Sequence, residues 1–283
     1  MPYFRFRDYP AETITDLRRQ FRAAAPYPHV VLDDVITVPA VDVLPGFPDP
    51  GWDGWSRFQD PYQRSKMYCD NIEVIPEPLA SMIRELNDPS TLRFLEALTD
   101  TPKLLPDPYL HGGGLHCSGT GGVLAPHTDF HAHRELDLFR RYNLLVYLNP
   151  GWDPSEGGAL ELFEEGHDRP AARITPNWGR CVIFQTDDHS VHGFTEPIRG
   201  SDVWRRSIAL YYYTSREAEA FSGDFNTYWR THSDLKGKKR LRLHAYRVLT
   251  MASRGFSSLA FRTNPDFVPP DVGNVSHPEP RSS

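Results

Sequence analysis

The chain has 283 residues and a mass of 32.3 kDa, which is long enough to bury a sizeable core without disulfide or metal support. Hydrophobic residues make up 39% and charged residues 24%, a composition typical of a globular protein rather than a disordered one. The formal net charge of -6 lacks the basic character of a nucleic-acid-binding domain. No stretch approaches the roughly 20 apolar residues of a membrane span. We therefore expect neither a nucleic-acid nor a membrane partner.

The termini and the cysteines bear on the cellular compartment. The first 20 residues lack the apolar core of a signal peptide. The three cysteines, Cys69, Cys117 and Cys181, are odd in number and widely spaced, which excludes a disulfide framework and a zinc ribbon. These features predict a soluble, cytoplasmic protein, and none of them specifies an oligomeric state.

The first hundred residues predict mainly helices. Apolar residues recur with helical spacing over 11–24 and again over 79–86. A further helix begins at Pro89, because Asp88 is a suitable N-cap and proline is favoured at the first helical position. A short apolar run at 29–33 predicts a strand.

The pattern changes after residue 110, where short apolar runs are separated by Gly, Pro, Asn and Asp. The predicted strands are 144–148, 159–163, 181–184 and 207–213. Such runs are typical of an antiparallel β core. We expect one domain over 1–263, followed by a proline-rich, loose tail at 264–283. Within the domain we expect a supporting N-terminal region at 1–105, a β core at 106–214 and a helical C-terminal extension at 215–263.

A candidate metal site begins at His127 and Asp129. In extended chain, residues two apart point to the same side, so this pair could share one metal ion. His192 is a third ligand from a later segment, with His189 as an alternative. Two histidines and one carboxylate form the facial triad of non-haem iron oxygenases. From the residues alone, a zinc hydrolase site and a plain His–Asp hydrogen bond are alternative interpretations.

An arginine pair opens the next strong strand. Arg205 and Arg206 begin the run 13 residues after His192. Alternation places Arg205 and Ser207 on one face and Arg206 on the other. A guanidinium binds a carboxylate through two parallel hydrogen bonds, so one of these arginines is a candidate anchor for an acidic ligand.

Taken in order, these motifs resemble the 2-oxoglutarate- and Fe(II)-dependent oxygenases, in particular the prolyl 4-hydroxylase-like branch. The resemblance covers 106–214 and rests on the segments 112–116, 127–130, 140–149, 156–162, 176–184 and 205–210, together with Trp152 and His192. It implies a mainly β protein with flanking helices, in which a double-stranded β-helix (a jelly-roll or cupin-like core) packs against the N-terminal helices.

The resemblance also assigns roles to single residues. His127, Asp129 and His192 match the catalytic iron ligands. Arg205, with Arg206 as the alternative, matches the arginine that pairs with the far carboxylate of 2-oxoglutarate. The residues expected to complete the cosubstrate pocket are Tyr147, Asn143, Leu145 and Ser207. In one respect the chain departs from the pattern, because His116 and Cys117 stand where some members carry a tyrosine.

The implied activity uses Fe(II), 2-oxoglutarate and O₂, with ascorbate as a stimulant, and oxidises an unactivated C–H bond with release of succinate and CO₂. Because Asp129 is retained, hydroxylation is expected rather than chlorination. We expect a small-molecule substrate, such as an amino acid or an intermediate of secondary metabolism. Candidate substrate contacts are His131, Arg134, Arg140 and Trp152. The alternatives are a peptidyl-prolyl hydroxylase acting on a protein partner and a non-catalytic, metal-binding jelly roll.

Overall fold

A computed structural model describes residues 2–133, 135–215, 228–229, 237–238, 241–246, 248–249 and 252. The α-helices are α1 (Ala11–Ala23), α2 (Ala40–Val43), α3 (Leu79–Leu86) and α4 (Pro89–Thr99). Short 3₁₀ turns occur at Phe6–Asp8, Leu44–Gly46 and Pro154–Glu156. The chain divides into two compact units, Met1–Ser233 and Asp234–Ser283.

Twelve strands form the β core of the first unit. They are β1 (His29–Leu32), β2 (Ser56–Asp60), β3 (Gln63–Cys69), β4 (Leu105–Pro106), β5 (Gly114–Thr128), β6 (Leu138–Tyr147), β7 (Leu160–Phe163), β8 (Pro170–Ile174), β9 (Cys181–Gln185), β10 (Val191–Phe194), β11 (Arg205–Ser215) and β12 (Tyr228–Trp229). All the pairings between these strands are antiparallel.

The long strand β5 belongs to both layers of the core. Its first part pairs with β3 and β11, and its last part pairs with β10. One layer therefore runs β2-β3-β5-β11-β6-β9-β1, and the other runs β5-β10-β7-β8. This arrangement is the predicted double-stranded β-helix, and its interior lies between the two layers.

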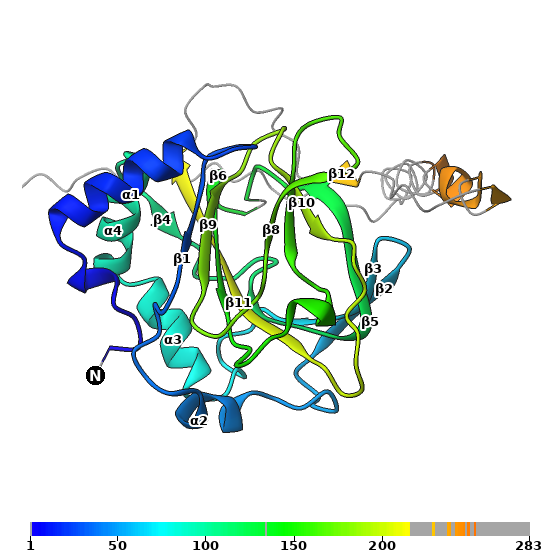
Figure 1. Ribbon diagram of the computed structural model, residues 1–283, viewed down its shortest axis with the longest axis horizontal. Coiled ribbons are helices and arrows are strands. Elements are labelled where there is room, and N and C mark those ends of the chain that lie inside the picture. The colour runs from blue at the N-terminus through cyan, green and yellow to red at the C-terminus, as the bar shows by residue number, and fades with distance from the viewer. Residues whose placement is uncertain are drawn as a thin grey trace, which may run out of the picture. The chain divides into compact units, whose positions relative to one another are not determined.

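Helices cover the outer face of the larger layer (Figure 1). Phe21 of α1, Met82 of α3 and Leu95 of α4 belong to one buried cluster with Ile208 and Leu210 of β11. The even-numbered residues of β11 therefore face the helices, and its odd-numbered residues face the interior, as the alternation predicted. Burial of these apolar side chains against the helices stabilises the outer face of β11. The inner face of the strand can therefore carry polar groups.

The N-terminal elements agree closely with the sequence-based expectations. Helix α3 has the predicted bounds, and α1 ends one residue earlier than predicted. Asp88 is the N-cap of α4, where its Oδ1 accepts hydrogen bonds from the backbone N–H groups of Ser90 and Thr91 at 2.8 and 2.9 Å. The β2–β3 hairpin was not predicted, because its strands are short and rich in polar residues.

The C-terminal predictions fall largely outside the described residues. Within the extension predicted to be helical at 215–263, residues 238, 241–246, 248–249 and 252 are helical, whereas 228–229 form the short strand β12. The tail at 264–283 and most of the extension at 215–263 lie outside the described part, so the division at residue 263 stays a prediction. None of the helices in the described part of the chain has the length and apolar character that a membrane span requires.

Gly114 makes a close approach that the entry into β5 requires. Its φ is +88°, and a Cβ at this position would lie 2.1 Å from the backbone oxygen of Cys69 on β3. Gly121 is a matched position, because its φ is +78° and nothing lies within 4 Å of an added Cβ. Alanine substitutions at the two positions therefore share the backbone strain of a positive φ, and only the one at Gly114 adds a steric overlap.

We expect Gly114→Ala to lower the free energy of unfolding by about 3 kcal/mol or more, since a methyl group would force β3 and β5 apart. Gly121→Ala should cost about 1 to 2 kcal/mol, which is the left-handed strain alone. Urea denaturation measures both values. Equal losses in the two variants would contradict the close approach.

Candidate active site

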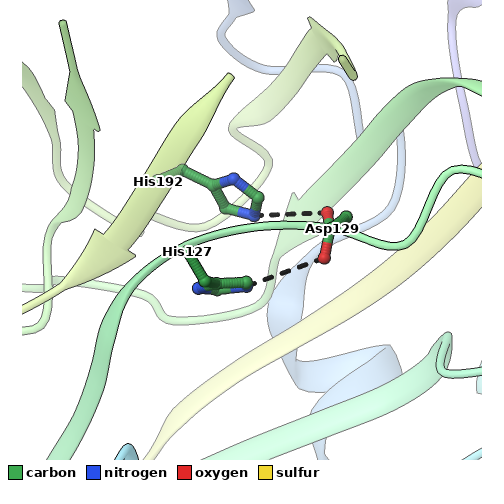
Figure 2. Close-up of side chains that lie close together, drawn as sticks. All are labelled: His127, Asp129 and His192. Atoms are coloured by element: carbon green, nitrogen blue, oxygen red, sulfur yellow. Dashed lines mark ion pairs between the residues drawn. The ribbon is translucent and has the colours of Figure 1, made fainter. Parts of the chain in front are cut away.

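The two candidate histidines lie side by side on paired strands. His127 on β5 and His192 on β10 are direct partners in the register, and their ring centroids are 4.5 Å apart. Asp129 follows the end of β5. Its Oδ1 lies 3.6 Å from Nε2 of His127, and its Oδ2 lies 3.4 Å from Nε2 of His192. Figure 2 shows the three side chains pointing toward one another.

Backbone carbonyls fix the orientation of both imidazole rings. Nδ1 of His127 donates to the oxygen of Ala125 at 2.8 Å, and Nδ1 of His192 donates to the oxygen of Ser190 at 3.1 Å. Each Nε2 therefore presents its lone pair to the common centre. Burial lowers the pKa of His192 to about 4, so this ring is neutral at pH 7. One donor atom from each of the three residues lies within 4.8 Å of the others, a set that fits a divalent metal ion such as iron.

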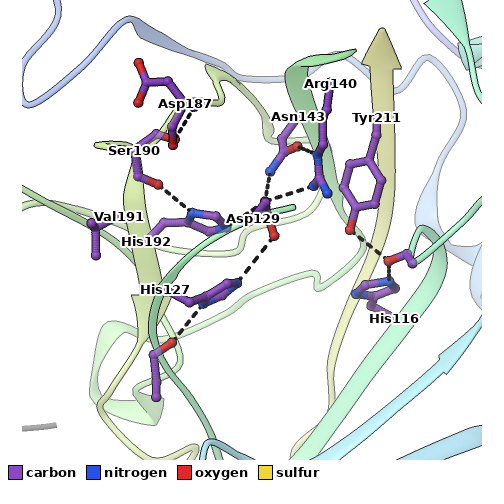
Figure 3. Close-up of polar contacts among 12 residues, drawn as sticks. His116, His127, Asp129, Arg140, Asn143, Asp187, Ser190, Val191, His192 and Tyr211 are labelled. Carbon is purple, nitrogen blue, oxygen red and sulfur yellow. Dashed lines mark hydrogen bonds and ion pairs between the residues drawn. The ribbon is translucent and has the colours of Figure 1, made fainter. Parts of the chain in front are cut away.

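The carboxylate of Asp129 is held by two side chains of β6 (Figure 3). Its Oδ2 accepts hydrogen bonds from Nη2 of Arg140 at 2.9 Å and from Nδ2 of Asn143 at 2.7 Å. Nε of Arg140 also donates to Oδ1 of Asn143 at 2.8 Å. Burial alone would raise the pKa of Asp129, but the permanent charge of Arg140, together with His192 and His127, holds that pKa well below its ordinary value. Asp129 is therefore an anion at neutral pH, as a metal ligand must be.

The alternative third ligand, His189, points elsewhere. Its side chain is 66% exposed, and its Nδ1 contacts Oε2 of Glu165 at 2.6 Å. Of the two histidines in this segment, His192 is the one whose ring meets His127 and Asp129.

One cavity connects these three residues with the predicted cosubstrate pocket. It is lined by Lys66, His116, Ser118, Leu124, His127, Asp129, Asn143, Leu145, Leu160, His192, Phe194, Arg205, Ser207, Ala209 and Tyr211. Arg205 lies in this lining, whereas the guanidinium of Arg206 lies 5.6 Å from the ring of Phe47. Of the two arginines, Arg205 is thus the one that lines the cavity, and its role as the cosubstrate anchor stays a prediction.

Arg205 is buried next to Tyr147, which is fully buried and is not among the residues that line the cavity. Its Nη2 donates to the Tyr147 hydroxyl at 3.1 Å, and its Nε donates to the backbone oxygen of Gly158 at 2.7 Å. These contacts use two of the five N–H donors of the guanidinium and leave others for a ligand. Asn143, Leu145 and Ser207 line the same cavity, and their contact with a cosubstrate stays a prediction.

His116 and Cys117, where the sequence departs from the family pattern, have different surroundings. His116 lines the cavity, and burial lowers its pKa to about 3, so its ring is neutral. Cys117 lies in the hydrophobic cluster on the opposite face of β5. Of these two residues, His116 is therefore the one that faces the cavity.

The proposed substrate contacts do not gather around the cavity. Arg140 is fully buried, with its guanidinium 3.3 Å from the ring centroid of Tyr211 and its polar atoms on Asp129 and Asn143. Trp152 packs in a buried cluster with Phe194, and His131 is buried next to Asp188. Arg134 lies outside the described residues. These contacts favour supporting roles for Arg140, Trp152 and His131, and a role in substrate binding stays a prediction.

Sequence reasoning missed Lys66. It lies on β3 and lines the same cavity as Arg205. The only sequence signal for it would have been a correct prediction of the β2–β3 hairpin and its pairing with β5.

Comparison with known proteins relates the β core to a family of enzymes. A sequence profile of the 2OG-Fe(II) oxygenase superfamily matches residues 113–213, the segment that carries the three candidate ligands and Arg205. This segment of the chain is therefore similar to the 2OG-Fe(II) oxygenases, and the match spans less than half of the 283 residues. The His127–Asp129–His192 donor set fits a divalent ion such as the Fe(II) in the name of that superfamily.

Two curated relatives match short segments of the chain. The chain is 31% identical over 78 residues to a mouse protein named prolyl 3-hydroxylase OGFOD1, a match that covers 26% of this chain and 14% of the relative. The Xenopus laevis protein of the same name is 33% identical over 61 residues, covering 20% of this chain and 12% of the relative. The chain thus aligns with only a small part of the length of each of these curated relatives.

A solved structure supports the fold. A prolyl hydroxylase from Trichoplax adhaerens, in complex with a hypoxia-inducible factor peptide fragment, superposes with a TM-score of 0.51 at 17% identity. The superposition covers 72% of this chain and 90% of that one. At this identity, the likeness extends to the jelly-roll architecture of the 2OG-Fe(II) oxygenases.

The contact of Arg140 with Asp129 predicts an effect on metal affinity. Replacing Arg140 with Met should raise the dissociation constant for Co(II), an oxygen-stable stand-in for Fe(II), by about 10- to 100-fold, because Asp129 loses a charged donor that stabilises its anion. Isothermal titration calorimetry measures the constant, and circular dichroism verifies the fold.

Arg141→Met is the matched control. The Nε of this neighbouring arginine donates to Oγ1 of Thr214 at 2.7 Å, and its side chain lines a different cavity. The affinity of this variant should stay within twofold of that of the unmodified protein. An unchanged affinity in a folded Arg140→Met variant would contradict the supporting role of Arg140.

Proposed function

We propose that this chain hydroxylates, or otherwise oxidises, an unactivated C–H bond of a small molecule and releases succinate and CO₂ from 2-oxoglutarate. The observation that carries the proposal is the single cavity that joins His127, Asp129 and His192 to Arg205. A ligand with a keto-acid group at one end and a carboxylate at the other can contact both sites at once.

Different residues would bind the iron and the 2-oxoglutarate. His127, Asp129 and His192 would hold the iron, which when bound supplies the activation of O₂. Arg205 and the Tyr147 hydroxyl would bind the distal carboxylate of 2-oxoglutarate. Burial raises the pKa of Tyr147, so its hydroxyl stays protonated and can donate a hydrogen bond to that carboxylate. Leu145, Leu160 and Phe194 supply the apolar walls that exclude water.

The burial of the candidate ligands favours a small substrate. The three candidate ligands are at most 9% exposed, and the cavity walls come from β3, β5, β6, β7, β10 and β11. Tyr211, Ala209 and Asn143 line its wall, and Asn143 contacts Asp129 there. We propose that the oxidised carbon lies near these residues.

A second candidate function is hydroxylation of a prolyl residue in a protein partner. It is favoured by the match to the two proteins named prolyl 3-hydroxylase, which are 31% and 33% identical over short segments. The enclosed cavity would then receive only the proline ring, and the rest of the peptide would lie on the surface of the protein.

Succinate release distinguishes these functions. Purified protein with Fe(II), 2-oxoglutarate and ascorbate is offered free amino acids and other small metabolites in one arm and proline-containing peptides in the other. We expect stoichiometric succinate and a product heavier by one oxygen atom in the small-molecule arm. Turnover in the peptide arm alone would replace the first candidate with the second.

Arg205→Ala and Arg206→Ala are the paired variants for this assay. Arg205→Ala should raise the concentration of 2-oxoglutarate needed for half-maximal turnover about 100-fold, because a charged, partly desolvated hydrogen-bond donor is lost. Arg206→Ala should change it less than twofold. An equal effect of the two variants would contradict the role proposed for Arg205.

A further inference from the structure

The cavity contains a second cation in addition to Arg205. Lys66 lies on β3 of the β2–β3 hairpin and lines the same cavity as the three candidate metal ligands. Among the described residues of the cavity lining, Asp129 is the only acidic one, and its Oδ2 is already held by Arg140 and Asn143. The rest of the lining therefore has an excess of positive charge.

The strand register places Lys66 in line with Arg205. Lys66 is the direct partner of Ser118 on β5, and Ser118 is the direct partner of Arg205 on β11. Directly paired residues on antiparallel strands have side chains on the same face, so these three form one row across the inner face of the sheet. With two strand spacings between them, the Cα atoms of Lys66 and Arg205 are about 10 Å apart. Both long side chains can reach a ligand that lies over Ser118.

The neighbouring His116 experiences both charges. Burial is the main reason why its pKa falls to about 3, and the charge of Lys66 is the next largest cause, with Arg205 acting in the same direction. His116 is thus a neutral ring beside two cations. Two cations near one another repel, and an anion bound between them would offset that repulsion.

Aromatic residues of the hairpin support the ammonium group. Nζ of Lys66 lies 5.8 Å from the ring centroid of Phe58 on β2, and this ring stacks on Tyr68 with centroids 4.9 Å apart. A cation near an aromatic face is attracted to it, which limits the range of positions that Lys66 samples.

We propose that Lys66 is a second cosubstrate-binding residue, whose ammonium group binds the distal carboxylate of 2-oxoglutarate together with Arg205. This inference rests on the proposed function, and it assigns to the β2–β3 hairpin a direct contact with the cosubstrate. Alternatively, Lys66 would bind a carboxylate of the substrate. The test below distinguishes this carboxylate from that of 2-oxoglutarate.

The test is an anaerobic titration of 2-oxoglutarate into the Fe(II)-loaded protein, followed by the visible charge-transfer absorption of the chelate. Lys66→Met should raise the dissociation constant of 2-oxoglutarate about 10- to 100-fold, as expected for the loss of a charged hydrogen-bond donor. Lys66→Arg should retain most of the affinity. Fe(II) affinity, measured separately, should be unchanged in both variants, which also shows that they are folded.

Arg64→Met is the matched control, because Arg64 is an exposed cation on the same strand and is not part of the cavity lining. It removes the same net charge and should change the dissociation constant less than twofold. A second titrant, 2-oxopentanoate, has the keto-acid end of 2-oxoglutarate but lacks its distal carboxylate. Its dissociation constant should be the same in the unmodified protein and in Lys66→Met.

Two results would overturn the proposal. The first is an unchanged affinity for 2-oxoglutarate in Lys66→Met; if the KM for the substrate rises in the same variant, the substrate's own anion lies at Lys66. The second is a loss of affinity that is equal for 2-oxopentanoate and 2-oxoglutarate. If the unmodified protein gives no absorption band at all, the proposed function itself fails, a result distinct from a band that Lys66→Met leaves unchanged.

Discussion

The buried carboxylate of Asp129 and the buried guanidinium of Arg140 form the interaction on which the candidate site depends. A lone charge in a protein interior is strongly unfavourable, so each of these groups needs the other and further hydrogen bonds. Asn143 supplies those bonds by contacting both of them. The aromatic rings of Tyr211 and Phe130 flank the guanidinium, with centroids 3.3 and 4.7 Å away. The end of β5 is thereby fixed to β6, and the carboxylate keeps the position from which it can meet the two histidines.

The strand topology supplies the rest of the site. Because β5 belongs to both layers, His127 at its end can pair with β10 while its beginning pairs with β11. The histidine pair and Arg205 therefore stand on opposite sides of one interior, joined by a single strand. Helices on the outer face of the larger layer bury the even-numbered residues of β11, which fixes the inward direction of Arg205. The site is thus a consequence of packing on the far face of the sheet.

The sequence predicted those features that depend on local pattern. The alternation of 205–213 assigned Arg205 to the interior, the pair at 127 and 129 identified two of the converging residues, and Asp88 identified a helix start. The role of Arg140 was not predictable, because a β-bulge changes the register of β6 near Arg141, so that simple alternation from Asn143 does not apply. Lys66 was missed because the polar β2–β3 hairpin has no hydrophobic alternation. Its place in the cavity depends on long-range pairing with β5.

The central claim is that His127, Asp129 and His192 hold an iron ion to which 2-oxoglutarate binds in the same cavity. The most direct measurement is the anaerobic visible spectrum of the protein with one equivalent of Fe(II) and excess 2-oxoglutarate, recorded beside Asp129→Ala. We predict a charge-transfer band in the unmodified protein that requires both additions, and no band in Asp129→Ala. A band of equal intensity in Asp129→Ala, or tight iron binding without any band in the unmodified protein, would contradict this account of the site.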